Sequence, residues 1–134
     1  MSYAAAPTLK DIDTLAREAL AKLPEPFAGY LQGVVLIIED LPSEDLLREL
    51  EIDDPFELTG LYSGRPAEHE AFTGDLPPMV HLFRRPILEE WIETGVRLEE
   101  LVSLILIHEV GHHFGLSDAD MAWLEDTLKA TSEA

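Results

Sequence analysis

The sequence predicts an α+β domain, in which a small antiparallel or mixed β-sheet packs on helices and one helix is central. Three observations predict this class. Apolar residues recur at helical spacing near both ends of the chain, short β-branched or aromatic runs lie between them, and residues 101–107 are apolar nearly all round, as in a helix at the centre of a fold. The length of 134 residues suits a single domain over 1–134, with frayed ends at 1–7 and 130–134.

The predicted elements follow one another without a Gly/Ser linker or an internal repeat. Helices are predicted from apolar spacing, and strands from short β-branched or aromatic runs bounded by Gly, Pro or Asp. Residues 64–78 are rich in Gly, Pro and charge, and form a loop long enough to suggest a functional role. The elements are a helix over 9–23, a strand over 33–38, a short helix over 44–50, strands over 58–62 and 79–83, and helices over 86–94, 98–114 and from 118 onwards.

Capping residues set the predicted helix ends. Thr8 followed by Asp11 forms a capping-box pattern at the start of the first helix. Ser43 and Ser117 precede the short helix and the last helix as N-caps. Gly115 ends the central helix, because glycine readily adopts the left-handed conformation that stops one.

Composition excludes several classes of function. Acidic residues outnumber basic ones 27 to 9, and the resulting net charge of −18 repels nucleic acid and anionic membrane surfaces, so neither is an expected partner. The chain has no cysteine, so any metal must be held by His, Asp or Glu. The N-terminal residues have no secretory-signal pattern and no apolar run is long enough to span a bilayer, so we expect a cytoplasmic protein.

One stretch carries chemistry, the HExxH motif formed by His108, Glu109, Val110, Gly111 and His112 on the central helix. Histidines four residues apart lie on one helix face, where both can bind one Zn²⁺. Glu109 lies beside that face, so its carboxylate can act as general base on a water molecule that the metal acidifies. A metal-free polar cluster is the alternative, but burying three such side chains in so apolar a helix would be costly.

The residues after the motif supply a third candidate ligand. After Gly115 the chain can turn back and bring Asp118 to the metal. Three protein ligands leave a fourth position for water, as a catalytic zinc site requires. Asp120 fits the N3 position of a capping box better, and is the substitute if Asp118 does not bind. His113 is rotated by about 100° from His112 around the helix, so the two do not face one metal.

These residues carry a resemblance to a known family. The stretch 108–121, HEVGHHFGLSDADM, resembles the extended HExxHxxGxxD zinc motif of metzincin-type metallopeptidases. With the length and the order of elements, it makes the chain similar to the bacterial minimal zincin-like metallopeptidases. Segments 58–64 and 82–89 are also similar to segments that recur in that family, so the resemblance spans residues 10–130.

The resemblance implies a zincin-like fold with zinc as the cofactor. By position in the motif, it implies His108 and His112 as zinc ligands, Asp118 as the third ligand and Glu109 as the catalytic base. The larger metzincins also place a methionine turn beneath the metal. Here the only methionine after the third ligand is Met121, whose spacing on the last helix is more typical of a core residue.

We therefore expect a zinc-dependent peptidase in which Glu109 moves a proton from water to the leaving amine. Short or unfolded peptides are the expected substrates, bound in extended form along a sheet edge, for which we expect the strand around Val80–Phe83. His81 and Tyr62 are candidate donors to an oxyanion. Two alternatives stay open, a zinc-containing binding or regulatory module with little or no hydrolysis, and hydrolysis of a non-peptide amide.

Overall fold

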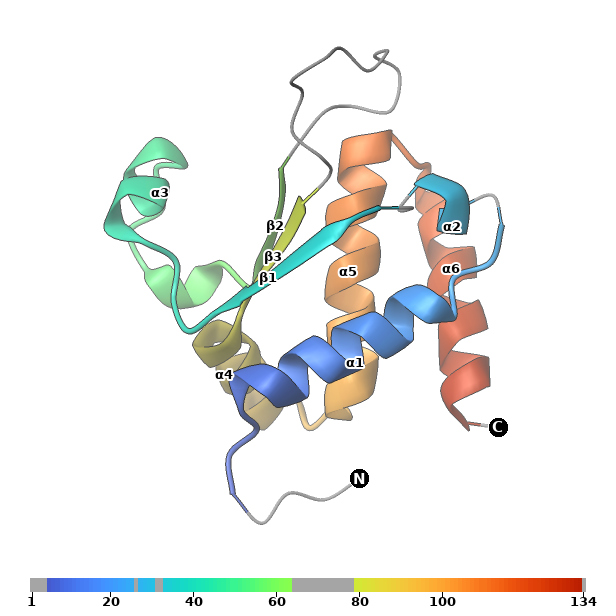
Figure 1. The fold of residues 1–134 in the computed structure, drawn as a ribbon, viewed down its shortest axis with the longest axis horizontal. Helices are drawn as coiled ribbons and strands as arrows, with labels where there is room; N and C mark the ends of the chain where they lie inside the picture. Colours follow the sequence, from blue (N-terminus) through green and yellow to red (C-terminus); the bar gives the residue numbers. More distant parts are fainter. Residues whose placement is uncertain (1–4, 26, 31–32, 64–78, 134) are drawn as a thin grey trace.

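The computed structural model describes residues 5–25, 27–30, 33–63 and 79–133. For residues 27, 30, 112–114 and 128–133 it describes the backbone only. The loop predicted over 64–78 lies outside the described residues. No helix in the described part of the chain is both long and apolar enough to cross a membrane. The elements (Figure 1) are α1 (Leu9–Ala21), α2 (Phe27–Tyr30), β1 (Val35–Glu39), α3 (Glu44–Glu49), a 3₁₀ turn (Pro55–Glu57), β2 (Gly60–Ser63), β3 (Met79–Phe83), α4 (Arg84–Thr94), α5 (Leu98–Phe114) and α6 (Asp118–Glu133).

The sheet is mixed, with the strand order β1–β3–β2 (Figure 1). β1 runs parallel to β3, with Ile37 opposite His81, and β2 runs antiparallel to β3, with Leu61 opposite the same residue. The predicted α+β class and small sheet are thus confirmed. The expectation that Val80–Phe83 is an edge strand is wrong, because β3 pairs on both sides. In the described sheet the edge strands are β1 and β2.

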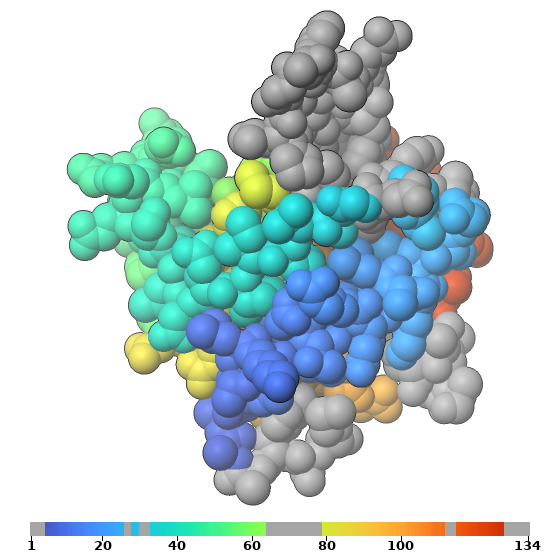
Figure 2. Space-filling view, viewed as in Figure 1, coloured from blue at the N-terminus to red at the C-terminus, as the bar shows by residue number. Residues whose placement is uncertain are grey.

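One face of the sheet packs on helices α1 and α5, and α6 packs against α5 (Figure 1). In the space-filling view, α1 and β1 lie next to each other across the face in view (Figure 2). Val80 and Leu82 of β3 are fully buried between sheet and helices, because alternate strand residues point to the same face. The central helix α5 supplies much of the core, with Leu98, Leu101, Val102, Ile105, Leu106, Ile107 and Val110 buried.

The helix caps predicted from the sequence are present. The backbone N–H of Thr8 donates to the Asp11 carboxylate over 2.8 Å, and the N–H of Asp11 donates to the Thr8 hydroxyl over 3.1 Å. The hydroxyls of Ser43 and Ser117 each accept from the N–H three residues on. Gly115 follows α5 with φ of 67°, the left-handed conformation expected of it. The short helix α2 and the 3₁₀ turn are not predicted by the sequence pattern.

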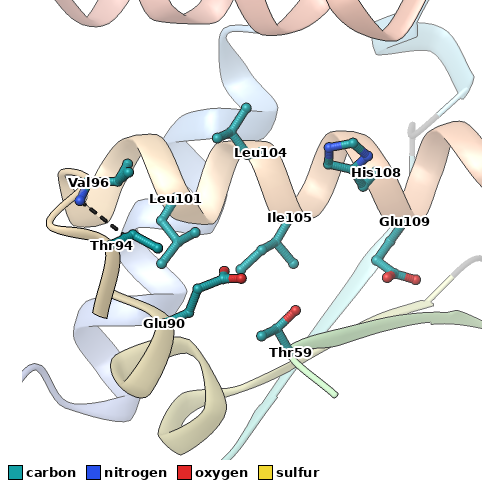
Figure 3. A pocket seen from close by; sticks show the side chains of 9 residues that line it. All are labelled: Thr59, Glu90, Thr94, Val96, Leu101, Leu104, Ile105, His108 and Glu109. Atoms are coloured by element: carbon teal, nitrogen blue, oxygen red, sulfur yellow. Dashed lines mark hydrogen bonds between the residues drawn. The ribbon is translucent and has the colours of Figure 1, made fainter. Parts of the chain in front are cut away.

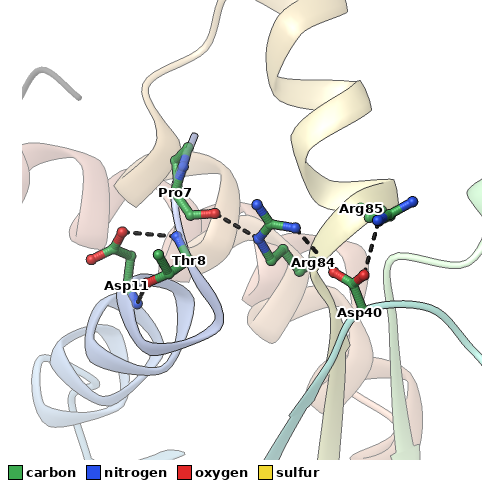
Figure 4. Close-up of polar contacts among 6 residues, drawn as sticks. All are labelled: Pro7, Thr8, Asp11, Asp40, Arg84 and Arg85. Carbon is green, nitrogen blue, oxygen red and sulfur yellow. Dashed lines mark hydrogen bonds and ion pairs between the residues drawn. The ribbon is translucent and has the colours of Figure 1, made fainter. Parts of the chain in front are cut away.

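Polar contacts attach the N-terminal segment to the start of α4 (Figure 4). Arg84 donates from Nε to the Pro7 carbonyl over 2.6 Å, and its Nη1 lies 3.0 Å from a carboxylate oxygen of Asp40. Arg85 pairs through Nε with the other oxygen of that carboxylate over 2.8 Å. Pro7 itself is buried, at the end of the segment 1–7 that the sequence predicts to fray. Residues 1–4 of that segment lie outside the described residues.

Candidate metal centre

The HExxH motif lies in the last two turns of α5, where Val110 and Gly111 are buried and the other face of the helix reaches the surface. The side chain of His108 is 53% exposed, and Glu109 is half-buried. The sequence predicts a motif enclosed in an apolar helix, and for His108 the structure differs, because this residue lies at the rim of the contact between α5 and α6. The cost of burying an imidazole without a metal therefore does not apply to His108.

His112 follows His108 by one helical turn. The backbone of α5 is helical through Phe114, so positions 108 and 112 lie on the same face of the helix. The side chains of His112, His113 and Phe114 lie outside the described residues. The spacing of the two histidines is thus present in the backbone, and binding of one metal by both stays a prediction.

A carboxylate from α6 contacts the first histidine of the motif. Oε1 of Glu125 lies 3.0 Å from Nε2 of His108, and the Glu125 side chain is 29% exposed. Sequence reasoning missed Glu125, because the contact depends on how α6 folds back along α5. One signal was present: Glu125 follows Asp118 by seven residues, or two helical turns, and so shares its helix face.

A pocket of about 390 Å³ opens beside the motif (Figure 3). His108 and Glu109 line one end of it, and Thr59 and Glu90 lie across from α5. Leu101, Leu104 and Ile105 of α5 form its apolar floor. An adjoining pocket of about 340 Å³ shares Thr59 and Glu90, and its other acidic lining residues are Asp54, Glu57, Glu89 and Glu93. The motif thus adjoins a cavity with both apolar and acidic lining residues. One of its lining residues, Thr59, directly precedes the edge strand β2.

Helix α6 packs against the motif through the side chain of Met121, which contacts the backbone of Gly111. A Cβ at Gly111, the fourth residue of HExxH, would lie 2.9 Å from Sδ, 3.0 Å from Cγ and 3.1 Å from Cε of Met121. Met121 is buried, in a cluster with Ile107 of α5 and Leu124 of α6. The interpretation of Met121 as a core residue is confirmed. The apolar cluster to which it belongs lies between α5 and α6 and contacts the motif at Gly111.

The two candidate oxyanion donors lie on opposite faces of the sheet. Tyr62 of β2 is buried on the face that packs on α5, where burial raises the pKa of its phenol above the usual value. His81 alternates with the buried residues of β3 and so points to the other face, where its Nδ1 lies 3.2 Å from Oε1 of Glu39. His81 is therefore not placed to act beside Glu109.

The third ligand expected from the motif begins α6. Asp118 is exposed and lies in the first turn of that helix, and it does not line the pocket that His108 and Glu109 share. Asp120 occupies its predicted capping position, with its N–H donating to Ser117 over 3.0 Å. Among the described side chains, no group of three His, Asp or Glu residues gathers as a ready metal site. Binding by Asp118 stays a prediction.

Comparison with known families identifies the class of protein. The family described as zincin-like metallopeptidase matches residues 31–128, well over half of the chain. The chain belongs to the zincin-like metallopeptidase family, which confirms the resemblance found in the motif. The α+β fold, with a small mixed sheet on a central motif-bearing helix, agrees with this assignment. No curated protein matches the chain.

The donor groups around the motif fit the zinc that the family implies. Zinc in proteins takes imidazole nitrogen and carboxylate oxygen as ligands. His108 presents an imidazole at the surface with the carboxylate oxygen of Glu125 beside it, and the backbone of α5 brings position 112 onto the same face. Glu109 is separate from the contact between His108 and Glu125, and its side chain lines the pocket. Histidine, carboxylate and a separate glutamate are the groups that a hydrolytic zinc site uses.

Proposed function

We propose that this protein is a zinc-dependent peptidase that cleaves short or unfolded peptides. The observation that carries the proposal is the shared pocket, because His108 and Glu109, neighbours in the HExxH motif, line one cavity on the surface of α5. A peptide in that cavity would lie within reach of both a metal ligand and a general base. The family match supports the chemical class and leaves the substrate to be measured.

His108 and His112 would hold the zinc, with a carboxylate from α6 as the third ligand, for which the motif predicts Asp118. When bound, zinc supplies Lewis-acid chemistry, by acidifying water and polarising a carbonyl. Glu109 would take a proton from water at its carboxylate and deliver it to the leaving amine. The half-buried position of Glu109, between solvent and the apolar floor of the pocket, leaves its carboxylate accessible for both transfers.

The substrate would bind along β2. Because β3 is central, a peptide strand can pair with the sheet only at an edge strand, β1 or β2. β2 is the edge strand next to the pocket, since Thr59, which lines the pocket, directly precedes it. Gly60 at the start of β2 lies so close to α5 that a Cβ there would be 3.0 Å from Ile105 Cγ2. This close approach sets β2 beside the helix that carries the motif. The acidic walls favour peptides with basic residues over acidic ones.

A zinc-containing binding or regulatory module is the second candidate. The contact between Glu125 and His108 favours it, because two histidines with two carboxylates would fill all four positions of a tetrahedral zinc site. Such a closed site would stabilise the helix pair without activating water.

The experiment that separates the two compares zinc-loaded wild type with Glu109→Gln on a library of short peptides of mixed charge. The proposal predicts cleavage by the wild type, loss of about 100-fold or more in kcat/KM for Glu109→Gln, and unchanged zinc content. Glu100→Gln, in the first turn of the same helix, is the matched control and should retain activity. Absence of cleavage by a fully loaded wild type would contradict the peptidase and favour the binding module.

A further inference from the structure

Gly60 in the edge strand β2 directs its backbone polar groups away from β3. The N–H of Phe83 in β3 donates to the Thr59 carbonyl over 2.9 Å. Hydrogen-bonded and non-bonded pairs alternate along an antiparallel ladder, so Gly60, which lies opposite Leu82, is at a position that makes no hydrogen bond to β3. Its N–H and C=O therefore point to the outer edge of the described sheet, where a peptide strand can pair with them.

The same register decides where a side chain of that peptide points. Residues directly opposite each other on neighbouring strands lie on the same face of a sheet. Gly60 faces α5, since a Cβ there would lie 3.0 Å from Cγ2 of Ile105. The peptide residue that pairs with Gly60 therefore directs its side chain towards α5, where Ile105 lines the pocket of about 390 Å³ beside the motif.

This pocket suits a side chain that is apolar along its length and positively charged at its end. Leu101, Leu104 and Ile105 form the apolar floor, and Figure 3 shows Glu90 of α4 pointing its carboxylate towards that floor. Glu90 is half-buried, and its carboxylate has no hydrogen bond or ion pair within the described part of the chain. Of the described residues that line this pocket and the adjoining one, none is lysine or arginine. The cavity therefore holds a carboxylate but no cation to balance it.

We propose that Glu90 determines specificity by selecting lysine or arginine at the peptide residue that pairs with Gly60, an inference that rests on the peptidase of the proposed function. Both side chains can lay a methylene stem on apolar surface while the charged end keeps a polar partner. The stem would lie on Leu101 and Ile105, and the charged end would donate to the Glu90 carboxylate. An acidic side chain at the same peptide position would bring two carboxylates together and be rejected.

The test uses capped octapeptides on a serine and alanine background, with lysine, norleucine or glutamate placed at each position in turn. Norleucine keeps the stem of lysine without its charge. For zinc-loaded wild type, lysine at one fixed position relative to the cleaved bond should raise kcat/KM by about 10-fold or more over norleucine, and glutamate there should lower it below the norleucine value. Glu90→Gln should reduce the preference for lysine to about threefold or less, and Glu90→Lys should favour glutamate instead.

A control variant and a binding measurement complete the test. Glu49→Gln removes the same charge from an exposed position of α3 that lines neither pocket, so it should keep the wild-type preference. Fluorescence anisotropy measures binding of labelled lysine and norleucine peptides to zinc-loaded Glu109→Gln, with and without Glu90→Gln. The lysine peptide should bind about 10-fold more tightly than the norleucine peptide, and only to the protein that retains Glu90.

The outcomes distinguish this inference from the proposed function. If wild type cleaves peptides without preferring lysine, or Glu90→Gln keeps the preference, the assignment of Glu90 is wrong and the peptidase stands. Equal effects of Glu49→Gln and Glu90→Gln would show a response to net charge alone and would also overturn the assignment. If the lysine peptide binds through Glu90 while wild type cleaves none of the peptides, the assignment stands and the peptidase does not. If the peptides are neither cleaved nor bound, both are wrong.

Discussion

The thioether of Met121 lies on the backbone of Gly111, inside the HExxH motif, with Sδ only 2.9 Å from where a Cβ would be. This contact connects the motif to α6 through close packing in the core. It holds α6 at a distance from α5 that brings Glu125 to His108. The glycine in HEVGH therefore has a packing role apart from any role in chemistry.

This packing predicts a strong coupling between the two positions. Gly111→Ala gains about 0.5–1 kcal/mol of helix propensity but must displace a buried side chain, at a cost of about 1–3 kcal/mol, so the variant should be less stable than wild type. Met121→Ala should lose about 2–5 kcal/mol by leaving a cavity. In the Met121→Ala background, Gly111→Ala should be neutral or stabilising. Urea unfolding with chelator present measures all four proteins, and equal effects of Gly111→Ala in both backgrounds would contradict the contact.

The two arginines at the start of α4 should differ in their effect on stability. Arg84 is 20% exposed and binds both Asp40 and the Pro7 carbonyl, so Arg84→Ala should lower the free energy of unfolding by about 1.5–3 kcal/mol. Arg85 is 56% exposed, and its ion pair in the described part of the chain is with Asp40. Arg85→Ala should therefore lower the free energy of unfolding by about 0–1 kcal/mol. Thermal unfolding compares them. A cost for Arg85→Ala equal to that for Arg84→Ala would show that the Pro7 contact contributes nothing.

Burial of Tyr62 predicts a loss of stability in alkali. Burial raises the pKa of its phenol in the folded state, whereas in the unfolded chain the value is about 10. Below about pH 10 the phenol is neutral in both states and its contribution is fully present. Above that pH the unfolded state ionises first, so stability falls as the pH rises through the folded-state value. Tyr62→Phe should flatten the fall in melting temperature between about pH 9 and 11, and an unchanged profile would contradict it.

Local signals predicted the helices well, because their determinants are close in sequence. The capping box of Thr8 and Asp11, the cap at Ser117 and the stop at Gly115 all form within a few residues. The predicted strand begins at Leu58, whereas β2 begins at Gly60, because the N–H of Leu58 donates to the Pro55 carbonyl and closes a 3₁₀ turn over Pro55–Glu57. Such a turn competes with the strand in a way that an apolar run does not reveal.

Relationships between distant segments could not be predicted in the same way. The central position of β3 depends on pairing with strands far along the chain on either side, which alternation within Met79–Phe83 does not encode. The contact of Glu125 with His108 depends on the register of two helices. The motif itself predicted the family, whereas the carboxylate that contacts His108 depends on that register.

Zinc content per chain tests the central claim most directly. The protein would be purified without chelator or metal-affinity resin, loaded with zinc, dialysed and measured by elemental analysis beside His108→Ala and His112→Ala. We predict about one zinc per wild-type chain, as three protein ligands hold one metal, and far less in either variant. Wild type without bound zinc, or variants that keep it in full, would contradict a metal centre at the HExxH motif.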